Sequence, residues 1–178
     1  MTQAHITHNT AVIILHQGIA YPSSQWQASS IRLPSGSSAE TCFAAASETS
    51  IIAERFLLSC TGIVPPEFAF CLFVTARMLL AHARHYRTDF PYEFNILTNS
   101  LLEMSRRWNG KNYIPKTEPE NLASKFAARL LQARDKGPAA AVEQPSLELR
   151  AAFYSEKTHL MLELHHKLNH RPQSHHKT

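Results

Sequence analysis

Histidine is the residue type that most invites a chemical role in this chain, because the sequence holds 11 of them. His166 and His170 are four residues apart, a spacing that lets two imidazoles share one metal ion on a helix. No cysteine, aspartate or HExxH-type glutamate completes such a site, so we favour a solvated histidine-rich face over a metal centre. The late cluster consists of His159, His165, His166, His170, His175 and His176.

The remaining histidines near predicted helices receive the same interpretation. His82 and His85 are three residues apart and have no further ligand at a useful spacing. His16 lies beside an apolar run, where a core histidine with a hydrogen-bond partner is more common than a metal ligand. The sequence therefore predicts no metal-binding residue.

Nucleophilic catalysis is also not indicated. Ser35-Gly36-Ser37 is expected in a loop without a preceding strand, so it lacks the strand and turn of a nucleophile elbow. Three cysteines occur in apolar surroundings without an identifiable base, which favours buried thiols in a reducing compartment over disulfides: Cys42, Cys60 and Cys71. No glycine-rich phosphate loop is present, and Gly137-Pro138 is interpreted as a linker. We therefore expect no enzyme, no catalytic residue and no cofactor-binding residue.

Basic residues offer two further candidates. Arg77 lies in an apolar stretch, where it either reads an acidic ligand or, as we favour, pairs with a glutamate of a neighbouring helix. The candidate partners are Glu40, Glu48, Glu54 and Glu103. A loose basic collar surrounds the best-defined helices, but a net charge of +4 and the lack of a recognition motif favour a solvated surface over a nucleic-acid site. The collar comprises Arg84, Arg87, Arg106, Arg107, Lys111 and Lys116.

The elements that would position these residues are all predicted to be helices. Only five glycines interrupt 178 residues, and no hairpin pattern is present, so the fold class is all-α, an irregular bundle of about five to six helices. Residues 1–168 are assigned to the helical domain and residues 169–178 to a disordered, polar, histidine-rich tail. The predicted helices cover residues 11–20, 37–60, 66–87, 91–109, 118–136 and 146–168, the last with Leu149, Phe153, Leu160, Leu164 and Leu168 facing inward.

Helix boundaries follow from capping residues. Ser37 with Glu40 predicts a capping box, as does Thr117 with Glu120. Pro65-Pro66 opens one helix at the position that tolerates proline best. Asp89 is expected to cap the next helix, and Asn109-Gly110 to end it.

Two apolar patterns identify the core. Phe68 to Ala81 is apolar at almost every position, which predicts a helix surrounded by others. It is about four residues too short for the ~18–20 that a membrane span requires, and it contains Arg77. The second pattern is a one-sided stripe in the following helix, where Glu103 and Arg107 are expected to pair on the exposed flank. The stripe consists of Phe94, Leu97, Leu101, Met104 and Trp108.

Three segments, in this order and spacing, carry a family resemblance: His16-Gln17 with Ala20-Tyr21-Pro22, then Ser37 to Cys42, then Glu103 to Gly110. Together they resemble the C-terminal part of the regulatory ("middle homology") domain of fungal zinc-cluster transcription factors. The similarity covers residues 7–110. It implies an all-helical, non-catalytic domain that regulates transcription in the nucleus. The family's zinc cluster lies in a separate N-terminal module.

The resemblance also limits what this chain is expected to do. Three cysteines cannot form the family's six-cysteine zinc cluster, so DNA would be bound only through a missing module and no cofactor is expected in this chain. We expect no membrane association. The expected partners are a second copy of the chain or another protein, through an apolar helical surface, with a small-molecule effector as a further ligand class.

Two questions stay open at this level. The chain is interpreted as a C-terminal piece of a longer domain, which predicts self-association if the missing part normally covers residues 68–81. The alternative function is a standalone helical protein-interaction module without a transcriptional role. A metal-dependent hydrolase that uses the late histidines is disfavoured, because the supporting carboxylates are lacking.

Overall fold

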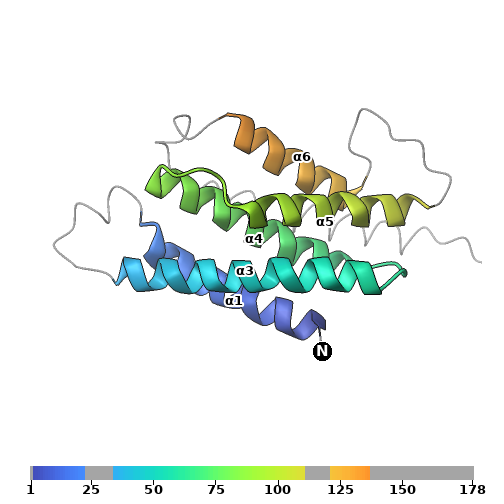
Figure 1. Ribbon diagram of the computed structural model, residues 1–178, viewed down its shortest axis with the longest axis horizontal. Helices are drawn as coiled ribbons and strands as arrows, with labels where there is room; N and C mark the ends of the chain where they lie inside the picture. The colour runs from blue at the N-terminus through green and yellow to red at the C-terminus, as the bar shows by residue number, and fades with distance from the viewer. Residues whose placement is uncertain (1, 23–33, 111–120, 137–178) are drawn as a thin grey trace, which may run out of the picture. The chain divides into compact units, whose positions relative to one another are not determined.

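Five helices build the part of the chain that the computed structural model describes, which is residues 2–22, 34–110 and 121–136. They are α1 (Thr2–Ala20), α3 (Ser35–Ser59), α4 (Pro66–Tyr86), α5 (Tyr92–Asn109) and α6 (Leu122–Asp135). Each helix runs antiparallel to the one before it, as Figure 1 shows. The predicted all-α class is confirmed. The predicted helix over residues 146–168 and the tail lie outside the described residues.

The helices stack in three layers (Figure 1). α1 packs along α3, α4 and α5 form the middle layer, and α6 lies against both α4 and α5. α4 is in contact with each of the other four helices. This position explains why almost every residue of its central stretch is apolar, as the sequence predicted.

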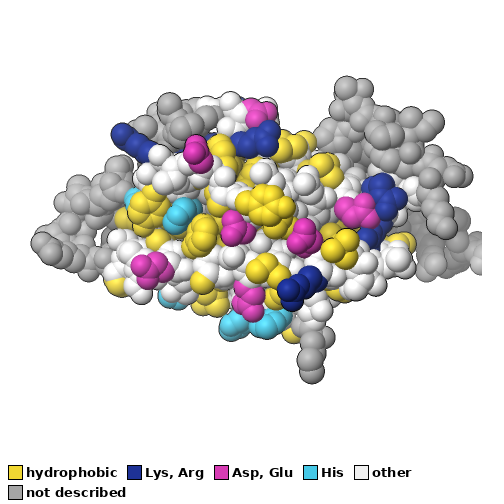
Figure 2. Space-filling view, in the orientation of Figure 1, with side chains coloured by type: hydrophobic (Ala, Val, Ile, Leu, Met, Phe, Trp, Pro, Cys, Tyr) yellow, Lys and Arg dark blue, Asp and Glu magenta, His cyan; other side chains and the backbone are white. Residues whose placement is uncertain are grey.

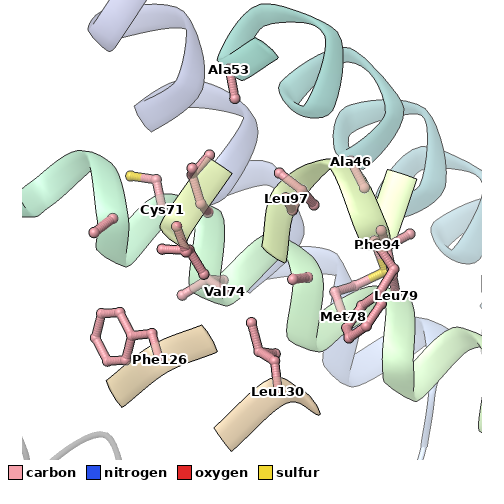
Figure 3. Packing of buried hydrophobic residues seen from close by; sticks show 14 of the residues in the cluster. Ala46, Ala53, Cys71, Val74, Met78, Leu79, Phe94, Leu97, Phe126 and Leu130 are labelled. Atoms are coloured by element: carbon pink, nitrogen blue, oxygen red, sulfur yellow. The ribbon is translucent and has the colours of Figure 1, made fainter. Parts of the chain in front are cut away.

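The core gathers around α4 (Figure 3). Its buried side chains include Leu72, Val74 and Leu79, and α6 adds Phe126 and Leu130. The Phe126 ring stacks on Phe73 of α4 with ring centroids 4.3 Å apart. The predicted stripe of α5 is confirmed, since Phe94, Leu97, Leu101 and Met104 are buried and Trp108 packs against the core.

Contrary to the prediction from residues 68–81, the whole helix α4, with 21 residues, is long and apolar enough to cross a membrane by length and composition alone. Within the bundle, however, 61% of that stretch is buried. The residues expected to form an exposed apolar patch are therefore covered by the helices of this chain itself. An exposed apolar patch at residues 68–81 was the reason for expecting self-association, and the described bundle has no such patch at these residues.

α1 begins at Thr2, nine residues before the predicted start at Ala11. The inward face of its first half carries Asn9 and Thr10 beside Ile6, and all three are buried. Thr10 donates to the Ile6 carbonyl at 2.8 Å, and Asn9 donates from Nδ2 to Glu48 of α3 at 2.9 Å. Because polar side chains occupy buried positions here, the apolar residues do not recur at helical spacing. The sequence therefore did not predict the first half of α1.

Two predicted caps are wrong, those at Ser37 and at Asp89. α3 begins at Ser35 after Pro34, so Ser35-Gly36-Ser37 lies in the helix rather than in a loop, and Pro34 makes no side-chain cap. α5 begins after Pro91, not at Asp89. α6 is capped by a reciprocal box between Asn121 and Ser124.

The remaining boundaries agree better with the predictions. Thr117 and Glu120, the predicted cap of α6, lie outside the described residues. Pro65 and Pro66 open α4 as predicted. Gly110 ends α5 with a φ of 84°, a conformation that favours glycine.

α4 ends without glycine. Arg87 takes the left-handed conformation with a φ of 54°, and its amide donates to the Arg84 carbonyl at 3.3 Å. The Thr88 amide closes the end of the helix by donating to the Ala83 carbonyl at 3.0 Å. The next helix, α5, starts at Tyr92, five residues after Arg87.

Candidate functional site

An open groove lies between α3 and α5. Its volume is about 250 Å³. α3 contributes Glu54 and Leu58, and α5 contributes Tyr92, Asn99, Glu103 and Arg107. Figure 2 views this face, where acidic and hydrophobic side chains alternate over α3 and α5.

Two large apolar side chains border the groove and point into solvent. Leu58 is 80% exposed and Tyr92 is 72% exposed. Ile51, one heptad before Leu58 on α3, is also exposed. Two exposed apolar side chains, Leu58 and Tyr92, therefore line one groove, which makes it a candidate contact surface.

At one end of the groove, Glu103 is hydrogen-bonded to two arginines of the same helix, an arrangement called the clamp below. Glu103 accepts hydrogen bonds from Nε of Arg106 at 2.7 Å and from Nε of Arg107 at 2.8 Å. Hydrogen bonds from Arg106 and Arg107 lower the pKa of Glu103 to about 2, so this carboxylate stays ionised at neutral pH. The predicted pair of Glu103 and Arg107 is confirmed.

Arg107 itself does not lie on an exposed flank, contrary to the prediction. Its side chain is 12% exposed. It donates to the carbonyl oxygens of Leu57 and Cys60 at the C-terminal end of α3. Beside it, Trp108 donates from Nε1 to the Val64 carbonyl at 2.8 Å. These hydrogen bonds from α5 hold the end of α3 and the α3–α4 connection against α5, and so position the two helices that line the groove.

The prediction for Arg77 is wrong among the described residues. None of the four candidate glutamates forms an ion pair with it. Its Nε is buried without a hydrogen-bond partner, and its guanidinium lies over the Phe73 ring at 5.8 Å from the centroid. Burial lowers the pKa of Arg77 to about 10.

His82 lies in an aromatic cluster that joins three helices. Its Nδ1 is 2.9 Å from the Tyr21 hydroxyl at the end of α1. Its ring contacts Phe43 of α3 and Tyr86 of α4. Burial and the neighbouring His85 lower the pKa of His82, and burial raises the pKa of Tyr21. The cluster holds the end of α1 against α4.

The other predicted chemical residues are dispersed. Cys42 and Cys71 are buried and Cys60 is half-buried, and all three are free thiols. Burial raises the pKa of Cys42 to about 11, which keeps it protonated. His16 lies 3.3 Å from the Ser38 hydroxyl. Within the described ranges, no group of three potential ligands is placed to hold a metal ion. The late histidines lie outside those ranges.

The predicted basic collar is not one surface. Arg84 donates to the Ala133 carbonyl of α6 at 2.5 Å, and Arg87 ends α4. Arg106 and Arg107 belong to the clamp on Glu103. Lys111 and Lys116 lie outside the described residues. The four arginines of the collar that the structure describes serve helix ends and one carboxylate.

Sequence reasoning missed the groove because its residues follow no motif. The only feature of the sequence that could have indicated the groove is that Leu58 and Tyr92 are apolar residues outside the buried stripes of their helices. No protein-family model, no curated protein and no solved structure matches this chain significantly.

Proposed function

We propose that this chain is a non-catalytic regulatory domain that acts in transcription by binding another protein through the α3–α5 groove. The observation that carries the binding role is the exposure of Leu58 and Tyr92 around a groove whose wall is fixed by the Arg107 clamp. An apolar surface on a rigid frame suits protein contact. At about 250 Å³ the groove is smaller than the roughly 300–1,000 Å³ of small-molecule pockets, which supports a protein over a small effector.

The transcriptional role rests on the resemblance to the regulatory domain of fungal zinc-cluster factors. The segments that carry it have structural roles in this bundle. Tyr21 bonds to His82, Cys42 is buried in the core, and Arg107 caps α3. Nuclear action is implied by the resemblance alone, which assigns DNA binding to a module that is missing from this chain.

A reporter assay tests the proposal. The full chain is fused to an unrelated DNA-binding module and compared with that module alone on the same promoter. We expect reporter output to change with the full chain, and the change to be lost in Leu58→Ser. Leu15→Ser is the matched control, because Leu15 is 74% exposed on α1, away from the groove.

The alternative is a helical protein-interaction module without a transcriptional role. It is distinguished by the same fusion. Unchanged reporter output together with measurable partner binding would favour the alternative. A fluorescent fusion of the full chain reports its location, and exclusion from the nucleus would contradict a transcriptional role.

A further inference from the structure

One tyrosine and two histidines tie the C-terminal end of α1 to α4. The two helices end on the same side of the bundle (Figure 1). The Tyr21 hydroxyl lies 2.9 Å from Nδ1 of His82. The Tyr21 ring meets the rings of His82 and His85 edge-on, with centroids 5.9 Å and 5.6 Å away. We call this contact between Tyr21, His82 and His85 the latch.

The hydrogen bond of the latch depends on the protonation state of His82. Burial raises the pKa of Tyr21, so its hydroxyl keeps its hydrogen. A neutral imidazole can accept that hydrogen at Nδ1, whereas a protonated imidazole has a hydrogen on both nitrogens and accepts nothing. After protonation, the acceptor left for Tyr21 among the described residues is the Met78 sulfur at 3.5 Å, and a thioether is a weak acceptor.

The surroundings of His82 offer no negative charge to balance a proton. No ion pair of the described residues involves His82 or His85. A charge on His82 would instead be repelled by a charge on His85, three residues further along α4. The groups that face the latch are Tyr21 of α1, Cys42 and Phe43 of α3, and Met78, His85 and Tyr86 of α4.

The rest of α1 is held by contacts that do not involve the latch. Asn9 donates to Glu48 of α3 at 2.9 Å, and His16 lies 3.3 Å from the Ser38 hydroxyl. Among residues 17–21, the hydrogen bonds to other helices that the structure describes are those of Tyr21. Loss of the latch would therefore free the last turn of α1 and leave its earlier turns in place.

We propose that the latch is an acid-sensitive switch, in which protonation of His82 releases Tyr21 and lets the last turn of α1 separate from α4 while the bundle stays folded. This inference goes beyond the proposed function, because it concerns neither the groove nor a partner.

The direction of the switch follows from the pKa of His82, which burial and the neighbouring His85 lower. In the released state the ring is solvated and takes up a proton near the ordinary value of 6.5. The released state therefore binds the proton more tightly than the latched state. The latch is closed above that pH and opens progressively as pH falls below it.

Hydrogen exchange of the full chain, read by mass spectrometry at about pH 7.5 and about pH 5.5, tests the switch. After correction for the intrinsic effect of pH on exchange, we expect the amides of residues 17–21 to lose protection at the lower pH. We also expect these amides to be less protected than those of Leu97 to Leu101 in α5. Low concentrations of urea should speed exchange in α5 but not at residues 17–21, because local opening exposes little surface.

Three variants assign the effect to the latch. His82→Phe keeps an aromatic ring but takes up no proton, so it is expected to abolish the acid-dependent loss at residues 17–21. Tyr21→Phe removes the hydroxyl alone and is expected to lower the protection of these residues already at about pH 7.5. His8→Gln is the matched control, since His8 is exposed on α1 outside the latch, and it should exchange as the unchanged chain does. Circular dichroism checks that the helices remain formed in each variant.

Three results would overturn the proposal. The first is equal protection of residues 17–21 at both pH values. The second is exchange of these residues at the rate and urea dependence of α5, which would mean that they open only when the whole bundle unfolds. The third is an acid-dependent loss that persists in His82→Phe. None of these measurements depends on the reporter assay, so the switch and the proposed function can fail separately.

Discussion

Arg107 of α5 donates a hydrogen bond from Nη2 to the carbonyl oxygen of Leu57 in α3, 2.7 Å away. The same guanidinium donates to the Cys60 carbonyl and to Glu103. The last carbonyls of a helix have no partner within that helix, and they carry the negative end of its dipole. A side chain from a different helix therefore completes the end of α3.

We expect Arg107→Met to lower the free energy of unfolding by about 2–4 kcal/mol, because it leaves buried carbonyls without donors. Urea unfolding followed by circular dichroism measures the change. Arg106→Met is the matched control. Arg106 shares the same carboxylate, but its side chain is 63% exposed, so little change is expected. Equal losses in both variants would show that the inward bonds of Arg107 contribute nothing.

Arg77→Leu is expected to leave the melting temperature unchanged or to raise it. Within the residues that the structure describes, the buried Nε of Arg77 has no hydrogen-bond partner and Arg77 forms no ion pair, so we expect the substitution to remove a desolvated charge instead of breaking an ion pair. Thermal unfolding of the unchanged chain and of Arg77→Leu measures whether the melting temperature rises or falls. A marked drop in melting temperature would mean that Arg77 has a stabilising partner after all.

The lowered pKa of His82 predicts that stability falls as the solution is acidified. The unfolded chain takes up a proton near the ordinary value of 6.5, whereas the folded His82 resists it. The folded state is therefore favoured above that pH and loses stability as pH falls below it. The groups facing His82 are Tyr21 of α1, Phe43 of α3, and His85 and Tyr86 of α4.

Unfolding free energies at about pH 7.5 and about pH 5.5 measure this dependence. His82→Phe keeps an aromatic ring in the cluster and is expected to reduce the loss on acidification. His8→Gln is the control, since His8 is exposed on α1 and lies outside this cluster. An unchanged pH dependence in His82→Phe would assign the acid sensitivity to other groups.

Gly110→Ala is expected to destabilise the chain by about 1 kcal/mol, because alanine disfavours a φ of 84°. Gly36→Ala is the matched control. A Cβ at either position meets no atom within 4 Å, but Gly36 lies in the first turn of α3 without a positive φ. Alanine should therefore stabilise that helix by about 0.5–1 kcal/mol. Equal effects at both glycines would contradict the role given to Gly110.

Some features of the fold could be predicted from the sequence because they depend on local patterns. The periodic apolar residues of α5 and the continuous apolar run of α4 predicted which helices are half-buried and which is central. Pro65-Pro66 and Gly110 marked boundaries, since their backbone restrictions act on their own residues.

The rest depended on contacts between residues far apart in the chain. The first half of α1 carries buried polar side chains whose partners lie partly on α3, so no local period revealed it. The sequence could not choose among the four glutamates proposed for Arg77, and only packing showed that none of them pairs with it. The groove joins Leu58 and Glu54 of α3 to Tyr92 and Glu103 of α5, and that juxtaposition exists only after the helices have packed.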